Sequence, residues 1–273
     1  MPVLHAFLGL DGSGREALAA QSGLPRAKDR EDALRLLRAG VSCALEAPSL
    51  RARGRKELVE RAKALGASAR AVLAARRLAD CLAAAPDRAE EIRGQYLAFC
   101  PPQPFEGWDE IALVRPEPQT LQSLDELFFG REGLFFLSQD NPFHAHSIGM
   151  HGALTARVLA RERPDDPALW LAGLLHDVGK ARTKAFLDSH GRPSPTAHFY
   201  GHECASAYEI LFLRFPAAVP ELERLRVSAM AAWHMVPYFF QNEHTRARYL
   251  RLWGERFLRD MEALDRADRA SQR

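Results

Sequence analysis

The first part of the chain alternates short apolar runs with amphipathic stretches. Apolar runs of roughly 4 to 8 residues, bounded by turn residues, are typical of buried strands. Such runs predict four strands, at residues 3–10, 41–48, 69–75 and 110–116. Helical patterns lie between them, near residues 16–21, at 30–39 and 55–66, and twice within 76–99. Strands that alternate with helices indicate a small parallel sheet with crossover connections, and therefore an α/β domain.

The rest of the chain is patterned for helices. Residues 148–161 bring apolar side chains and His151 to one face at helical spacing. Residues 165–180 begin with an aspartate that can cap a helix and with a proline near the first turn, and they continue as an apolar body. Further helices are predicted at residues 202–215, 219–235 and 244–268. These patterns indicate an all-α second domain.

Prolines mark the boundary between the two patterns. They are dense from Cys100 to Pro118, where P-P-Q-P-F-E-G and R-P-E-P-Q occur. Because proline cannot continue a helix or a central strand, such a stretch is typical of a connection between domains. We therefore expect an α/β domain at residues 1–116, a linker at 117–140 and a helical domain at 141–273.

The composition is that of an ordinary globular protein. Of the 273 residues, 47% are hydrophobic and 26% are charged, and the net charge of +2 does not favour tight binding of duplex DNA. The four cysteines lack the close spacing of a zinc site, so we expect reduced thiols and a cytoplasmic protein. The first residues do not resemble a signal peptide. No run approaches the ~20 apolar residues of a membrane span, so no membrane association is expected.

Histidines indicate where the chemistry lies. Nine of the ten histidines fall between His144 and His244. The strongest motif is H-D-V-G-K, in which His176 and Asp177 offer two different ligand types at the end of an apolar helix. An uncompensated buried Asp177 would be costly, and a divalent cation removes that cost. Gly179 is expected to end the helix, and Lys180 to neutralise a phosphate oxygen just past the metal.

Further ligands are needed to complete a metal site. His151 lies on the preceding helix, and two antiparallel helices can bring it beside His176. Asp265 and Asp268 lie one turn apart on the final helix, and we favour Asp268 as the last ligand. His202 and His234 each lie in or at the start of a helix and are the candidates for a second ion. We therefore predict one ion held by His151, His176, Asp177 and Asp268, and a second held by Asp177, His202 and His234.

The order of these residues resembles that of the HD superfamily of metal-dependent phosphohydrolases, over about residues 138–270. The segments Q-D-N-P-F-H, H-D-V-G-K, F-Y-G-H-E and W-H-M are similar to the HD domains of bacterial CCA-adding enzymes and of polynucleotide kinase–phosphohydrolase proteins. The resemblance implies phosphomonoesterase or 2′,3′-cyclic phosphodiesterase activity on RNA ends or nucleotides. It also implies one or two divalent transition-metal ions (Mn, Ni, Co or Fe), or Mg. Asp177 and Lys180 would then be the catalytic residues.

Three other functions fit the same motifs. The first alternative is a hydrolase of free nucleotide mono- or triphosphates. The second is a non-catalytic binder of RNA ends or nucleotides, and the third is a mixed-valent di-iron oxygenase. The complete ligand set and Lys180 argue against a pure binder, which has no need of them. Next to His202, Phe199 and Tyr200 are the candidates to line a base-stacking pocket.

A glycine-rich segment follows the first predicted strand. In G-L-D-G-S-G-R-E, Gly9 and Gly14 match the phosphate-loop pattern, but Arg15 replaces its lysine and Glu16 replaces its hydroxyl residue. The backbone amides and Arg15 could still hold a phosphate, whereas Glu16 opposes a bound nucleotide and its magnesium. A plain glycine turn is the alternative interpretation.

The surrounding sequence resembles the P-loop polynucleotide kinases. The resemblance rests on E-A-P-S at residues 46–49, on the arginine-rich helix after it, and on E-G-W-D-E-I at residues 106–111. The family's base, an aspartate between its first two strands, has only Asp29 as a candidate, in a poor position. We therefore expect a degenerate kinase-like domain without phosphoryl transfer, with the basic cluster at Arg51, Arg53, Arg55 and Lys56 as a solvated helix start.

Overall fold

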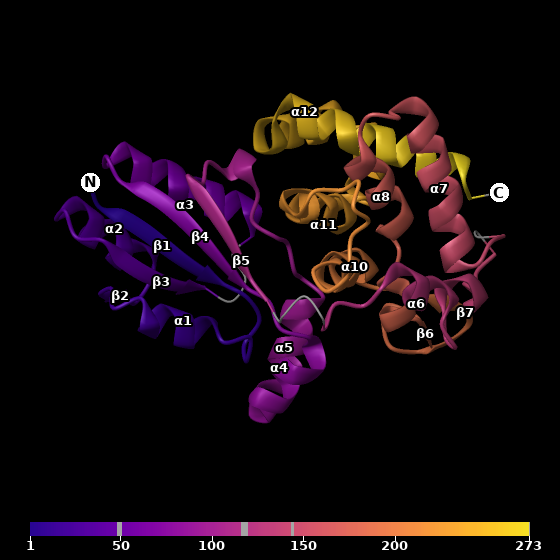
Figure 1. Ribbon diagram of the computed structural model, residues 1–273, viewed down its shortest axis with the longest axis horizontal. Coiled ribbons are helices and arrows are strands. Elements are labelled where there is room, and N and C mark those ends of the chain that lie inside the picture. The colour runs from indigo at the N-terminus through magenta and orange to yellow at the C-terminus, as the bar shows by residue number, and fades with distance from the viewer. Residues whose placement is uncertain (48–50, 116–119, 143–144, 273) are drawn as a thin grey trace. The chain divides into compact units, whose positions relative to one another are not determined.

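The computed structural model describes residues 1–47, 51–115, 120–142 and 145–272. The chain divides into two compact units, Met1–Glu117 and Pro118–Arg273 (Figure 1). Two of the sequence motifs lie partly outside the described residues: Pro48 and Ser49 of E-A-P-S, and Phe143 and His144 of Q-D-N-P-F-H. Within the described ranges, none of the helices has the length and apolar character needed to cross a membrane.

The first unit is built on a five-stranded sheet. The strands are β1 (Val3–Leu8), β2 (Arg26–Ala27), β3 (Cys43–Ala47), β4 (Ser68–Ala74) and β5 (Glu110–Val114). They lie side by side in the order β2-β3-β1-β4-β5, and every pairing is parallel (Figure 1). The connecting helices are α1 (Arg15–Gln21), α2 (Arg30–Arg38), α3 (Ala52–Ala64), α4 (Leu78–Ala84) and α5 (Ala89–Tyr96), with the 3₁₀ turns η1 (Pro86–Arg88) and η2 (Pro104–Glu106). The predicted parallel α/β arrangement is confirmed.

Four of the strands are visible as apolar runs in the sequence, and β2 is not. Strands covered on both faces are near-continuous apolar runs, and β1 and β4 bury most of their side chains. The missed strand β2 has only two residues, Arg26 and Ala27, and neither is buried. Its register against β3 comes from backbone pairing at Ala44 and Leu45. A two-residue edge strand without an apolar pattern leaves no periodicity to detect.

One member of the predicted basic cluster is buried, which corrects the expectation of a solvated helix start. Arg51 and Arg53 are exposed, but the side chain of Arg55 is 2% exposed and pairs with Glu106, which is 0% exposed. Two guanidinium nitrogens donate to the two carboxylate oxygens of Glu106, each over 2.7 Å. Trp108 Nε1 donates to the same carboxylate over 3.0 Å. The E-G-W-D-E-I segment therefore contributes a buried ion pair that joins α3 to the loop before β5.

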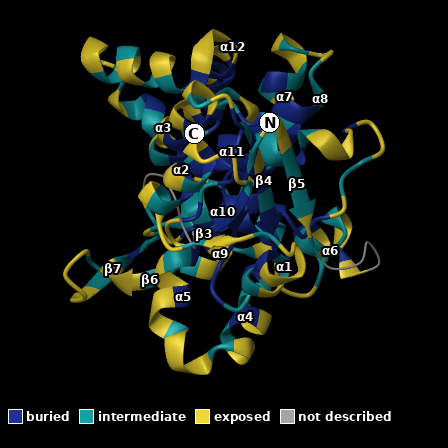
Figure 2. Ribbon diagram, turned by 90° about the vertical axis from the view of Figure 1, so that its left-hand side faces the viewer, coloured by how far each residue is buried: buried dark blue, intermediate teal, exposed yellow. Residues whose placement is uncertain are grey.

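The second unit is mostly helical. Its helices are α6 (Leu124–Phe129), α7 (Ile148–Glu162), α8 (Pro167–Leu175), α9 (Lys180–Thr183), α10 (His202–Ile210), α11 (Arg224–Trp233) and α12 (Glu243–Ala270), with 3₁₀ turns η4 (Leu134–Phe136), η5 (Glu221–Glu223) and η6 (Val236–Phe239). The predicted cap is present, since Asp166 accepts a hydrogen bond from Leu169 N and Pro167 opens α8. Helix α11 is buried along most of its length, whereas α12 keeps an exposed face (Figure 2).

The unit is not all-α as predicted, because it contains a two-stranded antiparallel hairpin. Strands β6 (Ala185–Leu187) and β7 (Pro193–His198) pair between α9 and α10. The sequence pattern did not predict this hairpin because β7 contains prolines, and proline is found in a sheet only on edge strands or at bulges. Helix α10 also stops at Ile210 rather than residue 215, because Gln122 takes over the backbone hydrogen bonds of Phe212 and Arg214.

The segment that we expected to be a linker belongs largely to the second unit. The boundary between the units falls between Glu117 and Pro118. Helix α6 and the turn η4 follow within the expected linker, and η4 contacts α7. Ser123 caps α6 by accepting from Glu126 N, a local signal that favours a helix there.

Two glycines set the distance between α7 and α8. A Cβ atom at Gly152 would lie 2.4 Å from Leu174 O, and one at Gly173 would lie 2.6 Å from Leu159 Cδ1. Neither position can accept a larger residue without moving a helix. The two helices therefore pack backbone to backbone, and this close packing brings His151 toward the end of α8.

The buried ion pair of the first unit gives a test of stability. Replacing Glu106 with glutamine leaves the Arg55 cation buried without its counter-charge, which costs about 3–5 kcal/mol of unfolding free energy. Glu31→Gln is the matched control, because Glu31 makes a similar bidentate pair with Arg61 at the surface. Because water screens both charges of that exposed pair, its loss should change the free energy of unfolding far less. Urea unfolding of the full chain, followed by circular dichroism, measures both; equal losses in the two variants would contradict the assignment.

Candidate metal centre

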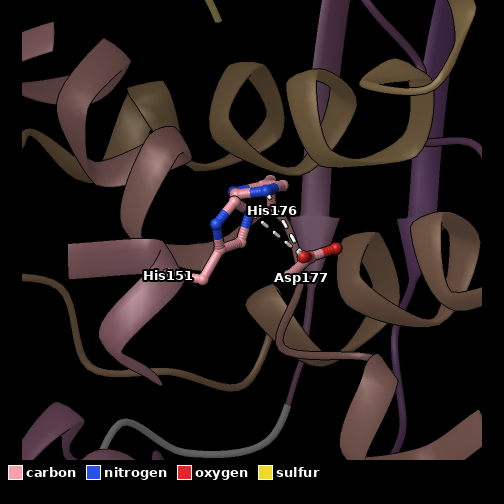
Figure 3. Close-up of side chains that lie close together, drawn as sticks. All are labelled: His151, His176 and Asp177. Atoms are coloured by element: carbon pink, nitrogen blue, oxygen red, sulfur yellow. Dashed lines mark ion pairs between the residues drawn. The ribbon is translucent and has the colours of Figure 1, made fainter. Parts of the chain in front are cut away.

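Six predicted ligand residues come together in the second unit. His151 lies on α7, His176 and Asp177 follow α8, His202 begins α10, His234 follows α11, and Asp268 lies in the last turns of α12. Asp177 is at the centre of the group. Its Oδ2 atom lies 3.6 Å from His151 Nε2 and 3.5 Å from His176 Nε2, and these three side chains face one another (Figure 3). Its Oδ1 atom lies 3.3 Å from His202 Nε2 and 3.6 Å from His234 Nε2.

The ligand atoms form two groups that share Asp177. His151, His176 and Asp177 make one group, and Asp177, His202 and His234 make the other, with the ligand atoms of each group within 4.8 Å of one another. Asp268 adjoins the first group, because its Oδ1 atom lies 2.9 Å from His151 Nε2 and 3.7 Å from His176 Nε2. The sequence predicts the same grouping of residues, and its two ion sites stay a prediction.

The second ring nitrogen of each histidine is held by the backbone. The Nδ1 atom of His151 lies 3.2 Å from Ser271 O, and the Nδ1 atoms of His176, His202 and His234 lie 2.8 Å from Gly173 O, Phe199 O and Ala231 O. A carbonyl oxygen only accepts, so each Nδ1 carries the proton. Each Nε2 atom points into the cluster, where a metal would bind its lone pair. Backbone contacts of this kind orient histidine ligands toward a metal.

The cluster is buried and contains polar atoms without hydrogen bonds. His151, His176, Asp177, His234 and Asp268 are all buried. His176 Nε2 and Asp177 Oδ1 lack a hydrogen bond of normal geometry within the part of the chain that the structure describes. Leaving such atoms unsatisfied costs about 1–3 kcal/mol each. Divalent cations in the two groups would satisfy both atoms, so the donor set fits a metal.

The electrostatics favour a charged Asp177 and a neutral His234. Burial would lower the pKa of His176, but Asp177 and Asp268 raise it. Burial would raise the pKa of Asp177, but Lys180 and the neighbouring histidines hold it well below its ordinary value. Burial and the nearby His176 lower the pKa of His234 to about 3. The carboxylate is therefore charged and the imidazole of His234 neutral near pH 7, as a metal site needs.

Lys180 and Gly179 have contacts that the sequence did not predict. The ammonium of Lys180 is buried, 2.7 Å from Asp177 Oδ2 and 2.8 Å from Gln139 Oε1. Lys180 thus contacts the central carboxylate, and its action on a phosphate stays a prediction. Gly179 does not end α8, since its φ is −66° and α8 stops at Leu175. Its role is close packing, because a Cβ there would lie 2.4 Å from His202 O.

Tyr238 is a neighbour of the cluster that sequence reasoning missed. Its hydroxyl donates to Asp268 Oδ2 over 2.9 Å and accepts from Gln272 Nε2 over 2.7 Å. The guanidinium of Arg269 lies 3.9 Å from the centre of the Tyr238 ring. With Oδ2 held by Tyr238, the Oδ1 atom of Asp268 turns toward His151. Asp265, the alternative ligand, pairs with Arg269 instead.

In the glycine-rich loop of the first unit, the charged side chains pair with one another. Strand β1 ends at Leu8 and α1 begins at Arg15, as a phosphate loop requires, and Gly9 and Gly14 both have positive φ. The Arg15 side chain is buried, however, and it donates to Gly9 O over 3.2 Å. It also forms ion pairs with Asp11 and with Glu16.

Asp11 ties this loop to α5 and to the turn before it. Its backbone N–H donates to Gln95 Oε1 over 2.8 Å, and its carboxylate accepts from Gln95 Nε2 over 2.7 Å. Arg88 pairs with the same carboxylate at 2.7 Å. Burial would raise the pKa of Asp11, but its hydrogen bonds to Arg15 and Gln95 lower it. A charged, buried carboxylate in the loop opposes a phosphate, and sequence reasoning missed it because the P-loop pattern leaves that position open.

The contact between Tyr238 and Asp268 gives a test of the cluster. Tyr238→Phe removes the hydrogen bond that orients Asp268, and loss of such an outer contact lowers metal affinity by about 10–100-fold. Tyr249→Phe is the control, because Tyr249 packs in the aromatic cluster around Trp253. Competition of the protein with a fluorescent chelator for Mn²⁺ measures the affinity. Equal Mn²⁺ affinities in the Tyr238→Phe variant and the unsubstituted protein would show that Tyr238 does not position a ligand.

Comparison with known proteins supports the assignment of the second unit. The family model of the HD domain matches residues 144–271, just under half of the chain. No curated protein matches the chain. The matched residues include all six members of the cluster, and the His and Asp groups fit metal binding. The second unit therefore carries an HD domain, which implies a metal-dependent phosphohydrolase.

Proposed function

We propose that the protein hydrolyses phosphate monoesters or 2′,3′-cyclic phosphates at RNA ends or in nucleotides. The observation that carries this proposal is the position of Asp177 between two histidine pairs whose Nε2 atoms face its two oxygens. One carboxylate shared by two groups of ligands suits a pair of ions that bind one phosphoryl group from two sides. The choice of RNA ends and nucleotides as substrates rests on the resemblance of the H-D-V-G-K and F-Y-G-H-E segments to HD domains that act in RNA metabolism.

The donor set indicates the class of metal. Four imidazoles and two carboxylates favour Mn, Fe, Co or Ni over Mg, which prefers oxygen ligands and keeps several waters. His151, His176, Asp177 and Asp268 would hold one ion, and Asp177, His202 and His234 the other. A divalent cation in such a site supplies Lewis-acid activation of the phosphoryl group and of the attacking water.

The chain's own residues orient the reaction. The backbone carbonyls that bind each Nδ1 atom keep the four imidazoles turned inward, so the donors are in place before substrate arrives. Asp177 would bridge the two ions or position the attacking water. Lys180 lies 2.7 Å from Asp177 Oδ2, where its charge also offsets the negative charge that develops on the phosphoryl oxygens.

The first unit is proposed to be kinase-like without phosphoryl transfer. Its Arg15 guanidinium, which a phosphate would need, is paired with Asp11 and Glu16. Asp29, the candidate base, caps α2 by accepting from Asp32 N, which is a structural role. Both observations support a loop that has kept its fold and lost its nucleotide chemistry.

Phosphate release tests the proposed activity. With Mn²⁺, Ni²⁺, Co²⁺ or Mg²⁺, we expect release from RNA with 2′-phosphate, 3′-phosphate or 2′,3′-cyclic ends, or from free nucleotides. Asp268→Asn should lower kcat/KM by more than about 100-fold, beyond what the loss of an outer contact costs. Asp265→Asn is the matched control one turn away, and it should keep most of the activity because Asp265 pairs with Arg269.

The substrate panel separates the alternatives. Activity on free nucleotides that is not improved in oligonucleotides would favour nucleotide turnover over RNA ends. Metal binding without phosphate release from any substrate would contradict the phosphohydrolase function. Iron content with oxygen consumption would then identify an oxygenase.

Restoring the phosphate loop tests the first unit. The double variant Arg15→Lys, Glu16→Ser should not gain kinase activity, because Asp11 still occupies the loop and Asp29 still caps a helix. The measurement is transfer of ³²P from ATP to the 5′-hydroxyl of an RNA oligonucleotide. End-labelling by the double variant well above that of the unsubstituted protein would show that only two residues separate this unit from a working kinase.

A further inference from the structure

A short segment joins the hairpin of the second unit to the cluster. Strand β7 ends at His198, and α10 begins four residues later at His202, a member of the metal-binding group. Gly201, with a φ of 77°, makes the turn into the helix. Since an extended chain spans at most ~3.6 Å per residue, the Cα atoms of Tyr200 and His202 lie within about 7 Å of each other. The backbone of this segment therefore lies close to the cluster.

The two aromatic residues of the segment face different surroundings. The ring of Phe199 is partly buried, with its centre 5.4 Å from the Lys180 ammonium, and so lies beside the polar cluster. The side chain of Tyr200 is 52% exposed. An exposed aromatic ring two residues from a proposed ligand offers a flat apolar surface at the edge of the site.

Tyr200 is held in place although it is exposed. Its ring lies parallel to that of His198, with an interplanar angle of 7° and 5.4 Å between the ring centres. Its hydroxyl is 3.2 Å from His198 Nδ1, and His198 Nε2 is 3.1 Å from Ser194 Oγ. Hydrogen bonds at both ring nitrogens thus fix His198, and His198 fixes Tyr200. A ring ordered in advance loses little conformational entropy when a second ring stacks on it.

Hydrogen bonds also hold the β6–β7 hairpin that precedes Tyr200. Asn141 Nδ2 donates to Ala197 O over 3.0 Å, and Ala197 N donates to Asp140 O over 2.9 Å. Gln139 in the same segment binds Lys180. The end of β7 is therefore tied to the cluster through residues 139–141, which keeps Tyr200 at a constant position relative to Lys180.

We propose that Tyr200, backed by His198, is a stacking surface for the base of a nucleotide whose phosphate lies at the cluster. The proposal rests on the proposed phosphohydrolase function and narrows its substrate to a nucleotide unit, free or at the end of an RNA strand. Every base has a flat face, so such a surface selects for a base without reading its identity.

The test compares substrates with and without a base. Adenosine 3′-phosphate and glycerol 2-phosphate both carry a secondary phosphate monoester beside a hydroxyl, and only the first has a base. Tyr200→Ala should raise KM for adenosine 3′-phosphate by roughly 5- to 150-fold, as loss of base–aromatic stacking does. It should leave kcat, and both constants for glycerol 2-phosphate, unchanged. Tyr200→Phe keeps the ring and its stacking on His198 and loses only the hydroxyl contact, so it should raise KM for adenosine 3′-phosphate less than Tyr200→Ala does.

A control variant and an independent readout complete the design. Phe129→Ala removes another exposed aromatic ring of the same unit and should change neither substrate's constants. Binding of adenosine, which has no phosphate to hydrolyse, should weaken in Tyr200→Ala by the same factor as KM rises. An oligoribonucleotide with a 3′-phosphate on its last nucleotide, compared with one whose last ribose lacks a base, tells an RNA end from a free nucleotide.

Each outcome has one meaning. Equal losses on the two phosphate esters would give Tyr200 a structural role in the cluster and overturn the proposal. Unchanged constants on both, or adenosine binding that is insensitive to Tyr200→Ala, would overturn it as well. Failure of the unsubstituted protein to hydrolyse either ester would remove the proposed activity on small phosphate monoesters, and adenosine binding would then decide the stacking surface by itself.

Discussion

The buried carboxylate of Asp177 is the constraint on which the second unit depends. A charged carboxylate out of water is tolerated only when opposite charge or strong donors surround it. Here the surroundings come from several helices: Lys180 contacts one oxygen, and histidines from α7, α10 and the end of α11 approach the two oxygens. The helices that form the core are thus the ones that deliver ligands. Stability of this unit and binding of its metal are coupled, because the cation that satisfies Asp177 also satisfies the buried His176 Nε2.

The approach of these helices to Asp177 depends on backbone contacts more than on side-chain size. Gly152 and Gly173 let α7 and α8 touch, and Gly179 lets the turn after Asp177 rest against α10, where Ser206 Oγ accepts from Gly179 N over 2.8 Å. The carbonyls at the helix ends serve a second purpose, since they have no partner further along their own helix. They accept from the Nδ1 atoms of the histidines and so orient the rings. Carbonyls in the last turns of α8 and α11, Gly173 O and Ala231 O, thereby set the direction of two of the four imidazoles, those of His176 and His234.

In the first unit, buried charges also need opposite charges, but these come from within the unit. Its loop after β1 leads into α1 and contains Gly9 and Gly14 with positive φ, but the chain itself pairs the charges of this loop. Arg15 is paired with Asp11, and Asp11 is paired with Arg88 and bound by Gln95. A second buried pair, Arg55 with Glu106, ties α3 to the loop before β5. Charges that would meet a nucleotide or nucleic acid are instead satisfied within the unit, which supports a structural role for this loop.

The sequence by itself determined the strands, the helices and the order of ligands, because periodicity and motif spacing are local properties. It predicted the parallel sheet from apolar runs, and His151, His176, Asp177, His202 and His234 from their helical setting. It did not reveal β2 or the β6–β7 hairpin, which lack a pattern, nor the burial of Arg55, since exposure depends on what packs above a residue. The choice of Asp268 over Asp265, the contact of Lys180 with Asp177, and the part of Tyr238 were decided by tertiary structure. Each depends on which side chain from a distant segment arrives at the same point, and no local pattern records that.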